Sequence, residues 1–437
     1  MSASLSAAIW QLPQRPVLGS GEPPARADVV VVGAGLAGLS CAYRILKEHP
    51  EKTVLVLEAG ELGGGASGRT TGMVTPGIGQ DFAGMMKRLG KEQATHLYRQ
   101  TLAAVRKVGE LIRDENIECE FDAAGQLVIA HGDDGEARLE RQARAMEACG
   151  LPLLRLSTEM LATRVKLGTG AGRYKSRALA GLYFVDAAML NPVKLLHGLA
   201  NAARKRGAKI VCNARVVAVT HGMHPAVKLE SGQVIPAGVV VLATASESMG
   251  LAKLSGRIIP ISLKVIATQP LSPAQLARIG WQGRECIIDS RRLFNYFRLT
   301  SDQRIVLGGG SPSYGAPAGV SPAFSDLVQE LKETFPGGED FGIARQWCGT
   351  IDYTLDGLPM IGPLQHGQDS VIYVGGFCGH GVALSMLAGE WVAAMVARAS
   401  PTRALPAFRH RAPLIPGEWL RKTCFSIACG WMRFRGG

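Results

Sequence analysis

Three glycines and one acidic residue near the N-terminus have the types and the spacing that could bind a dinucleotide. The stretch Gly33-Ala-Gly35-Leu-Ala-Gly38 has the GxGxxG pattern, and Glu58 lies twenty residues beyond its last glycine. In such a site the first glycine makes a tight turn, the second lets the backbone approach a pyrophosphate, and the third lets a helix pack on a strand. Glu58 would then accept hydrogen bonds from the ribose hydroxyls of adenosine.

A second glycine-rich loop follows directly and indicates which dinucleotide is bound. Residues 59–72 read AGELGGGASGRTTG, with Arg69 as their one cation. A loop of this kind allows close backbone approach and can follow an extended FAD toward its flavin. A nicotinamide-binding domain would continue with further βα units instead, so the pattern favours FAD over NAD.

The elements that would position these glycines form a right-handed βαβ unit. The sequence predicts a strand over 28–32, a helix over 39–47 and a strand over 53–57, within about thirty residues. Later segments are apolar enough to return to the same sheet: strands over 208–219, 226–230, 238–244 and 371–374, and a helix over 382–397 that follows a glycine loop.

The intervening residues predict a second domain. Helical patterns cover 84–115, 136–149 and 323–334, and strand patterns cover 124–130, 177–186 and much of 258–345; the helix predicted over 192–207 lies where the chain returns to the first domain. We therefore predict an α/β fold in which a Rossmann-like FAD-binding domain is interleaved with a substrate domain built on a mixed β-sheet. The predicted ranges are 27–80, 185–255 and 345–400 for the FAD-binding domain, 81–184 and 256–344 for the substrate domain, and 401–437 for a basic C-terminal tail.

Composition limits the class of protein. The chain has 437 residues, 47% hydrophobic and 19% charged, which is typical of a globular enzyme of two domains. Its nine cysteines are odd in number and form no CxxC pair, so we predict neither a disulfide framework nor a metal site. With no signal-peptide pattern and no run of eighteen apolar residues, the sequence predicts a cytoplasmic protein.

The net charge of +12 is concentrated at the C-terminus. Residues 401–437 hold seven Lys or Arg against one Glu, which is half of the total, so the body is only mildly basic and we expect no nucleic-acid partner. The tail also carries Trp419, Phe425, Ile427, Trp431 and Phe434. The favoured interpretation is a helix packed on its own protein, and the alternative is peripheral contact with the inner face of a membrane.

Motifs spread over nearly the whole chain resemble those of the flavin-dependent amine and amino-acid oxidases that include D-amino-acid oxidase, glycine oxidase and sarcosine oxidase. The motifs are GAGLAGLS with Glu58, GASGRTTG, VVLAT, Trp347-x-Gly349 with TxDxxPxIG, and GGxxGHG over 375–381. Tyr296-Phe-Arg298-Leu with LGGG over 307–310 is most similar to the gamma-glutamylputrescine oxidase-like members.

The resemblance implies a set of residues in contact with FAD. They are Gly33, Gly35, Leu36, Ala37, Gly38, Glu58, Ala59, Ala66, Ser67, Arg69, Thr70, Thr71, Val217, Ala243, Gly349, Gly376, Gly379, His380, Gly381 and Val382. The N-terminus of the helix that starts at Val382 would point at the flavin and favour its reduced form.

The resemblance also implies the reaction. A small amine or amino acid would lose hydride from its α-carbon to flavin N5, the resulting imine would hydrolyse, and oxygen or a quinone would be the final acceptor. By period two, Phe294, Tyr296 and Arg298 would share one strand face. Tyr296 and Arg298 would contact substrate, Arg298 through a carboxylate, although an interstrand salt bridge is an equal alternative. His380 would donate to the flavin or stabilise its loop.

Two positions depart from relatives within this group. Some sarcosine oxidases activate oxygen with a lysine, and Val306 occupies the aligned position, so oxygen and quinone both stay open as acceptors. The cysteine that binds flavin covalently in those enzymes aligns with Gly349, one residue past Cys348. We therefore predict non-covalent FAD, with a link through Cys348 as the alternative.

Other functions are compatible with the same motifs. One is a dehydrogenase of 2-hydroxy acids or polyol phosphates, which would turn over without releasing an amine. Another is an RNA-modifying flavoprotein, which would bind RNA with a steep dependence on salt. A third is a non-catalytic or membrane-docked flavoprotein, whose flavin no amine would reduce.

Overall fold

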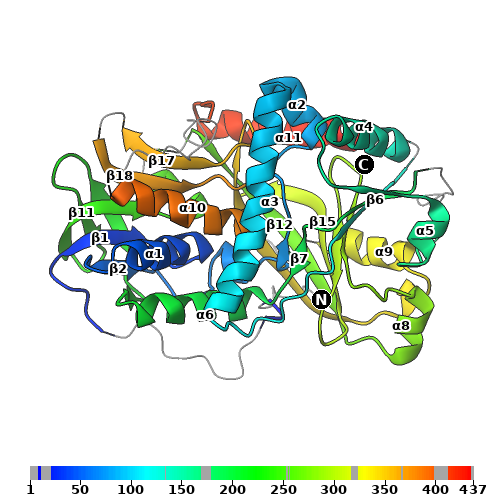
Figure 1. Cartoon of the computed structure of the whole chain (residues 1–437), viewed down its shortest axis with the longest axis horizontal. Coiled ribbons are helices and arrows are strands. Elements are labelled where there is room, and N and C mark those ends of the chain that lie inside the picture. The colour runs from blue at the N-terminus through cyan, green and yellow to red at the C-terminus, as the bar shows by residue number, and fades with distance from the viewer. Residues whose placement is uncertain are drawn as a thin grey trace.

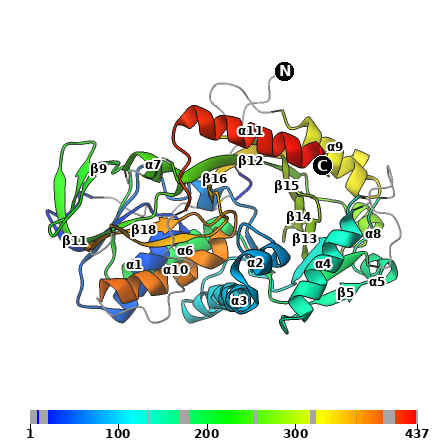
Figure 2. The ribbon, with the colours of Figure 1, turned by 90° about the horizontal axis from the view of Figure 1, so that it is seen from above.

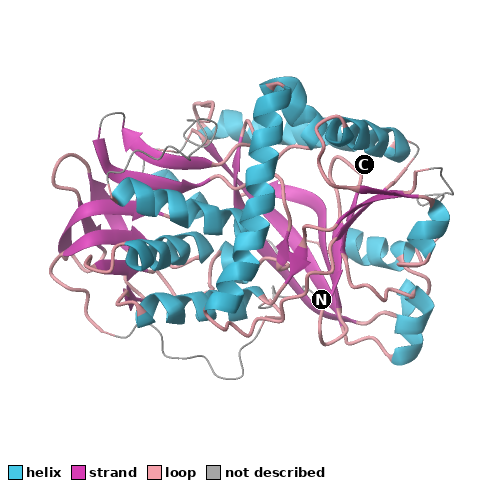
Figure 3. Cartoon of the chain, viewed as in Figure 1, coloured by secondary structure: helices cyan, strands magenta, loops and turns pink. Residues whose placement is uncertain are grey.

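Two eight-stranded sheets lie side by side along the longest axis of the molecule (Figure 1). The computed structural model describes residues 8–10, 21–132, 134–168, 179–251, 254, 256–315, 323–365, 368–397 and 412–434. Figure 3 shows helices on the outer sides of both sheets. This arrangement agrees with the predicted α/β fold of two interleaved parts.

The first sheet begins with the predicted βαβ unit. β1 (Ala27–Val32), α1 (Leu36–Glu48) and β2 (Val54–Leu57) follow in order, and β1 pairs in parallel with both β2 and β11 (Val234–Leu242). Almost every residue of β1 and β2 is buried, as expected for parallel strands covered on both faces. The strand order is β17-β18-β11-β1-β2-β8, completed by β8 (Lys209–Val211), β17 (Met360–Gln365) and β18 (Gln368–Gly375).

Helices and a hairpin complete this part. α1 packs against α6 (Pro192–Lys205) and α10 (Gly381–Val396) on one face of the sheet (Figure 1). β9 (Val216–Thr220) and β10 (Ala226–Leu229) form an antiparallel hairpin that extends from β11. Helix α10 is apolar on nearly all sides and packs against both α1 and α3 (Lys91–Asp114).

The second sheet is mixed, with the strand order β16-β12-β15-β14-β13-β4-β6-β5. Its long strands are β12 (Ile258–Thr268), β15 (Ile305–Tyr314) and the edge strand β16 (Ile343–Thr354), and of the strand pairs in this sheet β13 with β4 is parallel and the others are antiparallel. The shorter strands are β4 (Gln126–Ile129), β5 (Leu154–Leu156), β6 (Gly181–Phe184), β13 (Cys286–Asp289) and β14 (Tyr296–Leu299). The short strands β3 (Met73–Val74) and β7 (Ala188–Met189) pair with each other.

Helices surround the second sheet and one lies across it. They are α2 (Phe82–Leu89), α4 (Gly135–Glu147), α5 (Thr158–Ala162), α8 (Pro273–Ile279), α9 (Ser325–Thr334) and α11 (Glu418–Phe434), with the short α7 (Ser248–Leu251) near the first sheet. Figure 2 shows α11 over β12 and β15. Within the described ranges, no helix is both long and apolar enough to cross a bilayer.

Three details differ from the expected elements. The helix predicted over 84–115 is two helices, α2 and α3, because Gly90 between them has φ of +81°. The strand predicted over 208–219 is divided into β8 and β9 by residues 212–215. β16 pairs with β12 along most of its length, so residues 345–354 belong to the second sheet, although the predicted FAD-binding range starts at 345.

Candidate FAD and substrate site

The first glycine turn has the shape that a dinucleotide site requires. Gly33 has φ of +101°, and a Cβ there would lie 2.6 Å from the carbonyl oxygen of Ala243. A Cβ on Gly38 would lie 1.9 Å from the carbonyl oxygen of Gly33, so α1 can approach β1 only without a side chain at this position. The first turn of α1 carries no acidic residue, so its positive end suits a pyrophosphate, although the N–H of Leu36 donates to Ser67 Oγ.

Glu58 ends β2 beside this turn. Its carboxylate accepts hydrogen bonds from the backbone N–H of Ala34 at 2.9 Å and of Gly60 at 3.1 Å. The backbone carbonyl of Glu58 accepts a hydrogen bond from the N–H of Ala214. Ala214 lies just before β9, in which the side chain of Val217 is 47% exposed. Because each carboxylate oxygen can accept more than one hydrogen bond, the position fits the predicted contact with ribose hydroxyls.

The second glycine loop connects the first turn to the second sheet. Ser67 Oγ accepts from the N–H of Leu36 at 3.0 Å, within the 3₁₀ turn Ala66–Gly68. Arg69 donates through Nε to the carbonyl of Gly64 at 3.0 Å and through Nη1 to the carbonyl of Cys348 at 3.2 Å. The loop therefore spans the space between α1 and β16.

Three consecutive carbonyls of this loop are held by side chains from outside it. Trp347 Nε1 donates to the carbonyl of Arg69 at 2.9 Å, and Trp10 Nε1 donates to that of Thr70 at 2.7 Å. Arg298 Nη1 donates to the carbonyl of Thr71 at 2.8 Å. Sequence reasoning missed Trp10; the one available signal was a single Trp in an N-terminal segment otherwise poor in large side chains.

Arg298 is almost fully buried on β14, at 1% exposure. Its Nη1 also donates to the carbonyl of Leu190 at 2.6 Å, while its Nε has no hydrogen-bond partner among the described residues. Burial lowers the pKa of the guanidinium to about 10, so it stays charged at neutral pH. Among the described residues, the hydrogen bonds of Arg298 go to backbone carbonyls, and the carboxylates of Glu120 and Asp122 act on it electrostatically without a salt bridge to either.

Tyr296 lies two residues before Arg298 on the same strand. Its ring lies against Gly308 of β15, where a Cβ would come within 2.2 Å of it, and burial raises the pKa of its hydroxyl. Phe294 precedes β14, is 46% exposed and contacts the Tyr296 ring with centroids 6.1 Å apart. Of the three residues predicted to share one strand face, Tyr296 and Arg298 lie two apart within β14, and Phe294 lies before the strand.

The C-terminal glycine loop is held by a buried carboxylate that sequence reasoning missed. Asp352 on β16 accepts a short hydrogen bond from the N–H of Gly376, whose φ is +71°. Burial raises the pKa of Asp352 to about 6. An acid inside an otherwise strand-like stretch was the available signal. The carboxylate fixes the loop that leads into α10.

His380 is the N-cap residue of α10. Its ring lies against Gly77, where an added Cβ would be 3.1 Å from Cε1 of His380. Nδ1 lies 3.5 Å from Oγ1 of Thr75. Desolvation lowers the pKa of His380 to about 4, so the imidazole is neutral at pH 7. This arrangement fits a loop-stabilising role better than a role as a proton donor in the imidazolium form.

Cys348 and Gly349 lie on opposite sides of β16. Gly349 faces Arg69, because a Cβ added to Gly349 would lie 3.3 Å from the Cβ of Arg69. The Cys348 side chain lies in the hydrophobic cluster with Phe297 and Leu331 on the other face of the sheet. Burial raises the pKa of its thiol, which disfavours the reactive thiolate.

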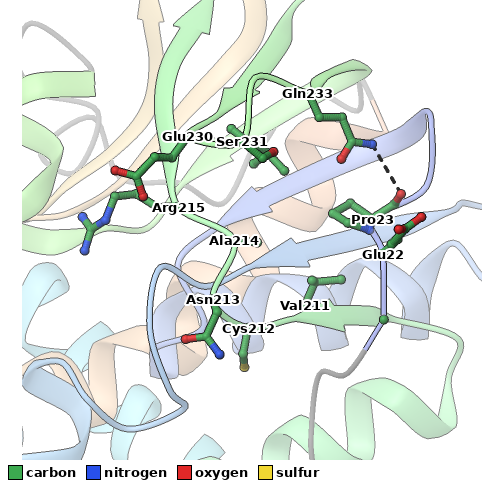
Figure 4. Close-up of a pocket in the computed structure, with 12 residues that line it drawn as sticks. Glu22, Pro23, Val211, Cys212, Asn213, Ala214, Arg215, Glu230, Ser231 and Gln233 are labelled. Carbon is green, nitrogen blue, oxygen red and sulfur yellow. Dashed lines mark hydrogen bonds between the residues drawn. The ribbon is translucent and has the colours of Figure 1, made fainter.

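A cavity of about 580 Å³ lies at the outer edge of the first sheet (Figure 4). It is lined by residues 211–215, 229–231 and 233, with residues 21–23 closing one side through a hydrogen bond from Gln233 to the carbonyl of Pro23. It contains none of the residues predicted to contact FAD or substrate. Within the described residues, no group of three His, Cys, Asp or Glu side chains is arranged to hold a metal ion.

The glycine turn with its acidic partner and the second loop define a flavoprotein of the dinucleotide-binding class. The chain belongs to the FAD dependent oxidoreductase family, whose sequence model matches residues 28–395. The residues present fit FAD at both glycine loops, so the predictions of family and cofactor are confirmed.

Individual relatives are similar along most of their length. The chain is 31% identical over 371 residues to gamma-glutamylputrescine oxidoreductase of Escherichia coli (strain K12), covering 84% of this chain and 83% of that protein. It is 26% identical over 349 residues to sarcosine oxidase subunit beta of Rhodobacter capsulatus, covering 78% of each. Glycine oxidase from Geobacillus kaustophilus has a similar fold, with a TM-score of 0.71 at 21% identity, covering 90% of this chain and 100% of that one. The chain is thus an FAD-dependent oxidoreductase of the amine and amino-acid oxidase type.

Proposed function

We propose that the protein oxidises the C–N bond of a small amine or amino acid that carries a carboxylate, giving an imine that hydrolyses in water. FAD, when bound, supplies the hydride acceptor at N5. The residues that would hold it are the Gly33 turn, Glu58, the loop 66–71, Gly349 and the loop 376–382. The remaining task of the chain is to bind the substrate, orient it and exclude water.

The observation that carries this proposal is the buried guanidinium of Arg298, which forms no salt bridge with a carboxylate of the described residues. A buried charge is costly unless it is paired, and the Nε of Arg298 has no partner among the described residues. The guanidinium lies next to the loop predicted to lie along the flavin, through its bond to Thr71. A substrate carboxylate would supply the missing counter-charge in a geometry that Arg suits.

The surroundings of Arg298 favour exclusion of water. On the same side of the sheet, Val265, Ala267, Val306 and Trp347 form an apolar cluster that also includes Trp10. Tyr296 lies beside Arg298 and, with its raised pKa, keeps its proton at neutral pH. Tyr296 would therefore act as a hydrogen-bond donor to the substrate and not as a base.

The test is anaerobic bleaching of the flavin absorption by amino acids, each paired with the amine that lacks its carboxylate. An amino acid should bleach the flavin absorption, and the amine that lacks its carboxylate should bleach it less or not at all. Recovery of the absorption in air would identify an oxidase, and its absence would identify a dehydrogenase that uses a quinone. Bleaching only by 2-hydroxy acids or polyol phosphates would overturn the proposal.

The role of Arg298 can be tested separately with Arg298→Lys. Loss of a charge-assisted hydrogen bond should raise KM for the amino acid about tenfold or more, at roughly 1.5–3 kcal/mol per bond. The partner amine provides the matched control, because its KM should change much less. Equal increases in KM for both compounds would assign Arg298 to holding the loop alone.

We also propose that α11 contacts an anionic membrane surface. One side of the helix packs on β15 through Arg421 and Phe425, and the other exposes Trp419 at 71%, Ile427 at 66% and Phe434 at 89%. Aromatic and aliphatic side chains beside basic residues are typical of helices that lie in a membrane interface. The cytoplasmic location stays a prediction.

Flotation with vesicles tests this contact. The protein should float with vesicles that contain an anionic lipid and less with neutral ones, and Trp419→Ser with Ile427→Ser should abolish flotation. Met223→Ser is the matched control, because Met223 is 91% exposed but lies in the hairpin region of the first sheet. A lipid-independent dimer that the double variant disrupts would instead assign the face to a second copy of the chain.

A further inference from the structure

We propose that Trp10, within residues 8–10, belongs to the FAD site as a positioning residue for the loop 69–72. This inference rests on the proposed placing of the flavin along that loop. Residues 8–10 lie outside the matched family range, which begins at residue 28. Trp10 would act by holding one peptide group of the loop and by covering Arg298.

Trp10 is anchored by several contacts at once. It is 8% exposed, and its indole donates to the carbonyl of Thr70 at 2.7 Å. Its ring packs in the cluster with Val306 and Trp347, and the guanidinium carbon of Arg298 lies 5.3 Å from the ring centroid. A cation over an aromatic face is stabilised by the ring quadrupole, more so away from water. The indole therefore fixes Arg298 as well as the loop.

Fixing the Thr70 carbonyl also fixes the next N–H. In a trans peptide group the C=O and the N–H point in opposite directions. The N–H of Thr71 therefore points away from Trp10, and Thr71 is one of the residues predicted to contact FAD. With Trp347 and Arg298 holding the neighbouring carbonyls, the three donors set the orientation of consecutive peptide groups.

Other side chains of the loop do not replace this contact. Arg69 is already engaged with the carbonyls of Gly64 and Cys348. Gly72 cannot carry a side chain, because a Cβ there would lie 2.2 Å from the carbonyl of Leu190 and 2.6 Å from Nη1 of Arg298. The orientation of the Thr70 peptide group is therefore set from outside the loop.

The experiment compares Trp10→Phe with Trp281→Phe in the full-length protein. Trp10→Phe keeps an aromatic ring over Arg298 but removes the indole N–H. Trp281 is the matched control, because it is 4% exposed in a hydrophobic cluster beside the second sheet. Its Nε1 has no hydrogen-bond partner among the described residues. Each apoprotein is titrated with FAD, and the dissociation constant is read from quenching of flavin fluorescence.

We expect roughly three- to tenfold weaker FAD binding in Trp10→Phe, the effect of one hydrogen bond. The Trp10→Phe apoprotein should fold and melt only slightly below the wild type, because it loses one hydrogen bond and part of a buried ring, and Trp281→Phe should bind FAD as the wild type does. Trp10→Ala should weaken FAD binding further and raise KM for an amino-acid substrate, because it also uncovers Arg298.

Equal FAD binding by the wild type and Trp10→Phe would overturn the inference. Equal losses of FAD affinity in Trp10→Phe and Trp281→Phe would also overturn it, because they would reflect a general effect on packing. Both measurements need no substrate, so they are independent of the proposed reaction. If Trp10→Phe binds FAD like the wild type while amino acids bleach the wild-type flavin, only the inference about Trp10 is overturned. If Trp10→Phe binds FAD more weakly but no amino acid bleaches the wild-type flavin, only the proposed reaction is overturned.

Discussion

Replacing Asp352 with Asn should remove a pH-dependent loss of stability. The carboxylate is 5% exposed and accepts the N–H of Gly376, and burial raises its pKa from 3.8 to about 6. The folded state therefore holds the proton more tightly than the unfolded state does. The contribution of this group is most favourable below pH 3.8 and is lost as pH rises through about 6.

The size of the effect follows from the two pKa values. Linkage gives a cost of roughly 3 kcal/mol at pH 8 and roughly half of that at pH 5. The Asn side chain has no charge to bury, and its amide oxygen can still accept the N–H of Gly376. The free energy of unfolding of Asp352→Asn, relative to the wild type, should therefore rise by about 1 to 2 kcal/mol between pH 5 and pH 8.

Urea denaturation at pH 5, 6, 7 and 8 measures this difference. Asp340→Asn is the control for a general effect of losing one negative charge, because the Asp340 side chain is 58% exposed at the surface. A difference between Asp352→Asn and the wild type that is the same at every pH would refute the reasoning. It would mean that the carboxylate is equally easy to ionise in the folded and unfolded chain.

Three further predictions concern the cofactor site. Gly38→Ala should yield protein without flavin absorption, because its Cβ would lie 1.9 Å from the Gly33 carbonyl, while Gly60→Ala, with open space around it, should keep the flavin. The pKa of His380, lowered from 6.5 to about 4, implies that its stabilising contribution is complete above pH 6.5 and declines toward pH 4. The pH profile of kcat/KM between pH 6.5 and 9 should then be the same for His380→Asn as for the wild type, and an inflection that only the wild type shows would contradict this. Acid precipitation should release flavin equally from the wild type and Cys348→Ala, and flavin retained only by the wild type would demonstrate a covalent link.

Local patterns were enough to predict the first glycine turn and its acid. Gly33, Gly38 and Glu58 lie within one βαβ unit, where the sequence spacing and the spatial spacing are tied together by a single helix. The buried helix α10 was also predictable, because it is apolar on nearly every side. In each case the deciding contacts lie within or next to the element itself.

Long-range contacts explain what could not be predicted. Trp10 and Asp352 have partners 60 and 24 residues away, and nothing in their neighbours along the chain indicates those partners. For Arg298 the residue type predicted a carboxylate partner, from the substrate or from another strand, and gave no sign of its bonds to the carbonyls of Thr71 and Leu190. A carbonyl is present at every position, so no pattern of residue types could single out these two.

The three donors that hold residues 69–71 also set an order of assembly. They come from positions 60, 227 and 278 residues away along the chain. During synthesis the loop leaves the ribosome early, but Trp347 follows only after most of the protein has been made. The loop thus has these three donors together only after β16 has paired with the second sheet. With the flavin placed along this loop as proposed, FAD would bind late in folding, and a nascent chain that stops before residue 347 would lack one of the three donors.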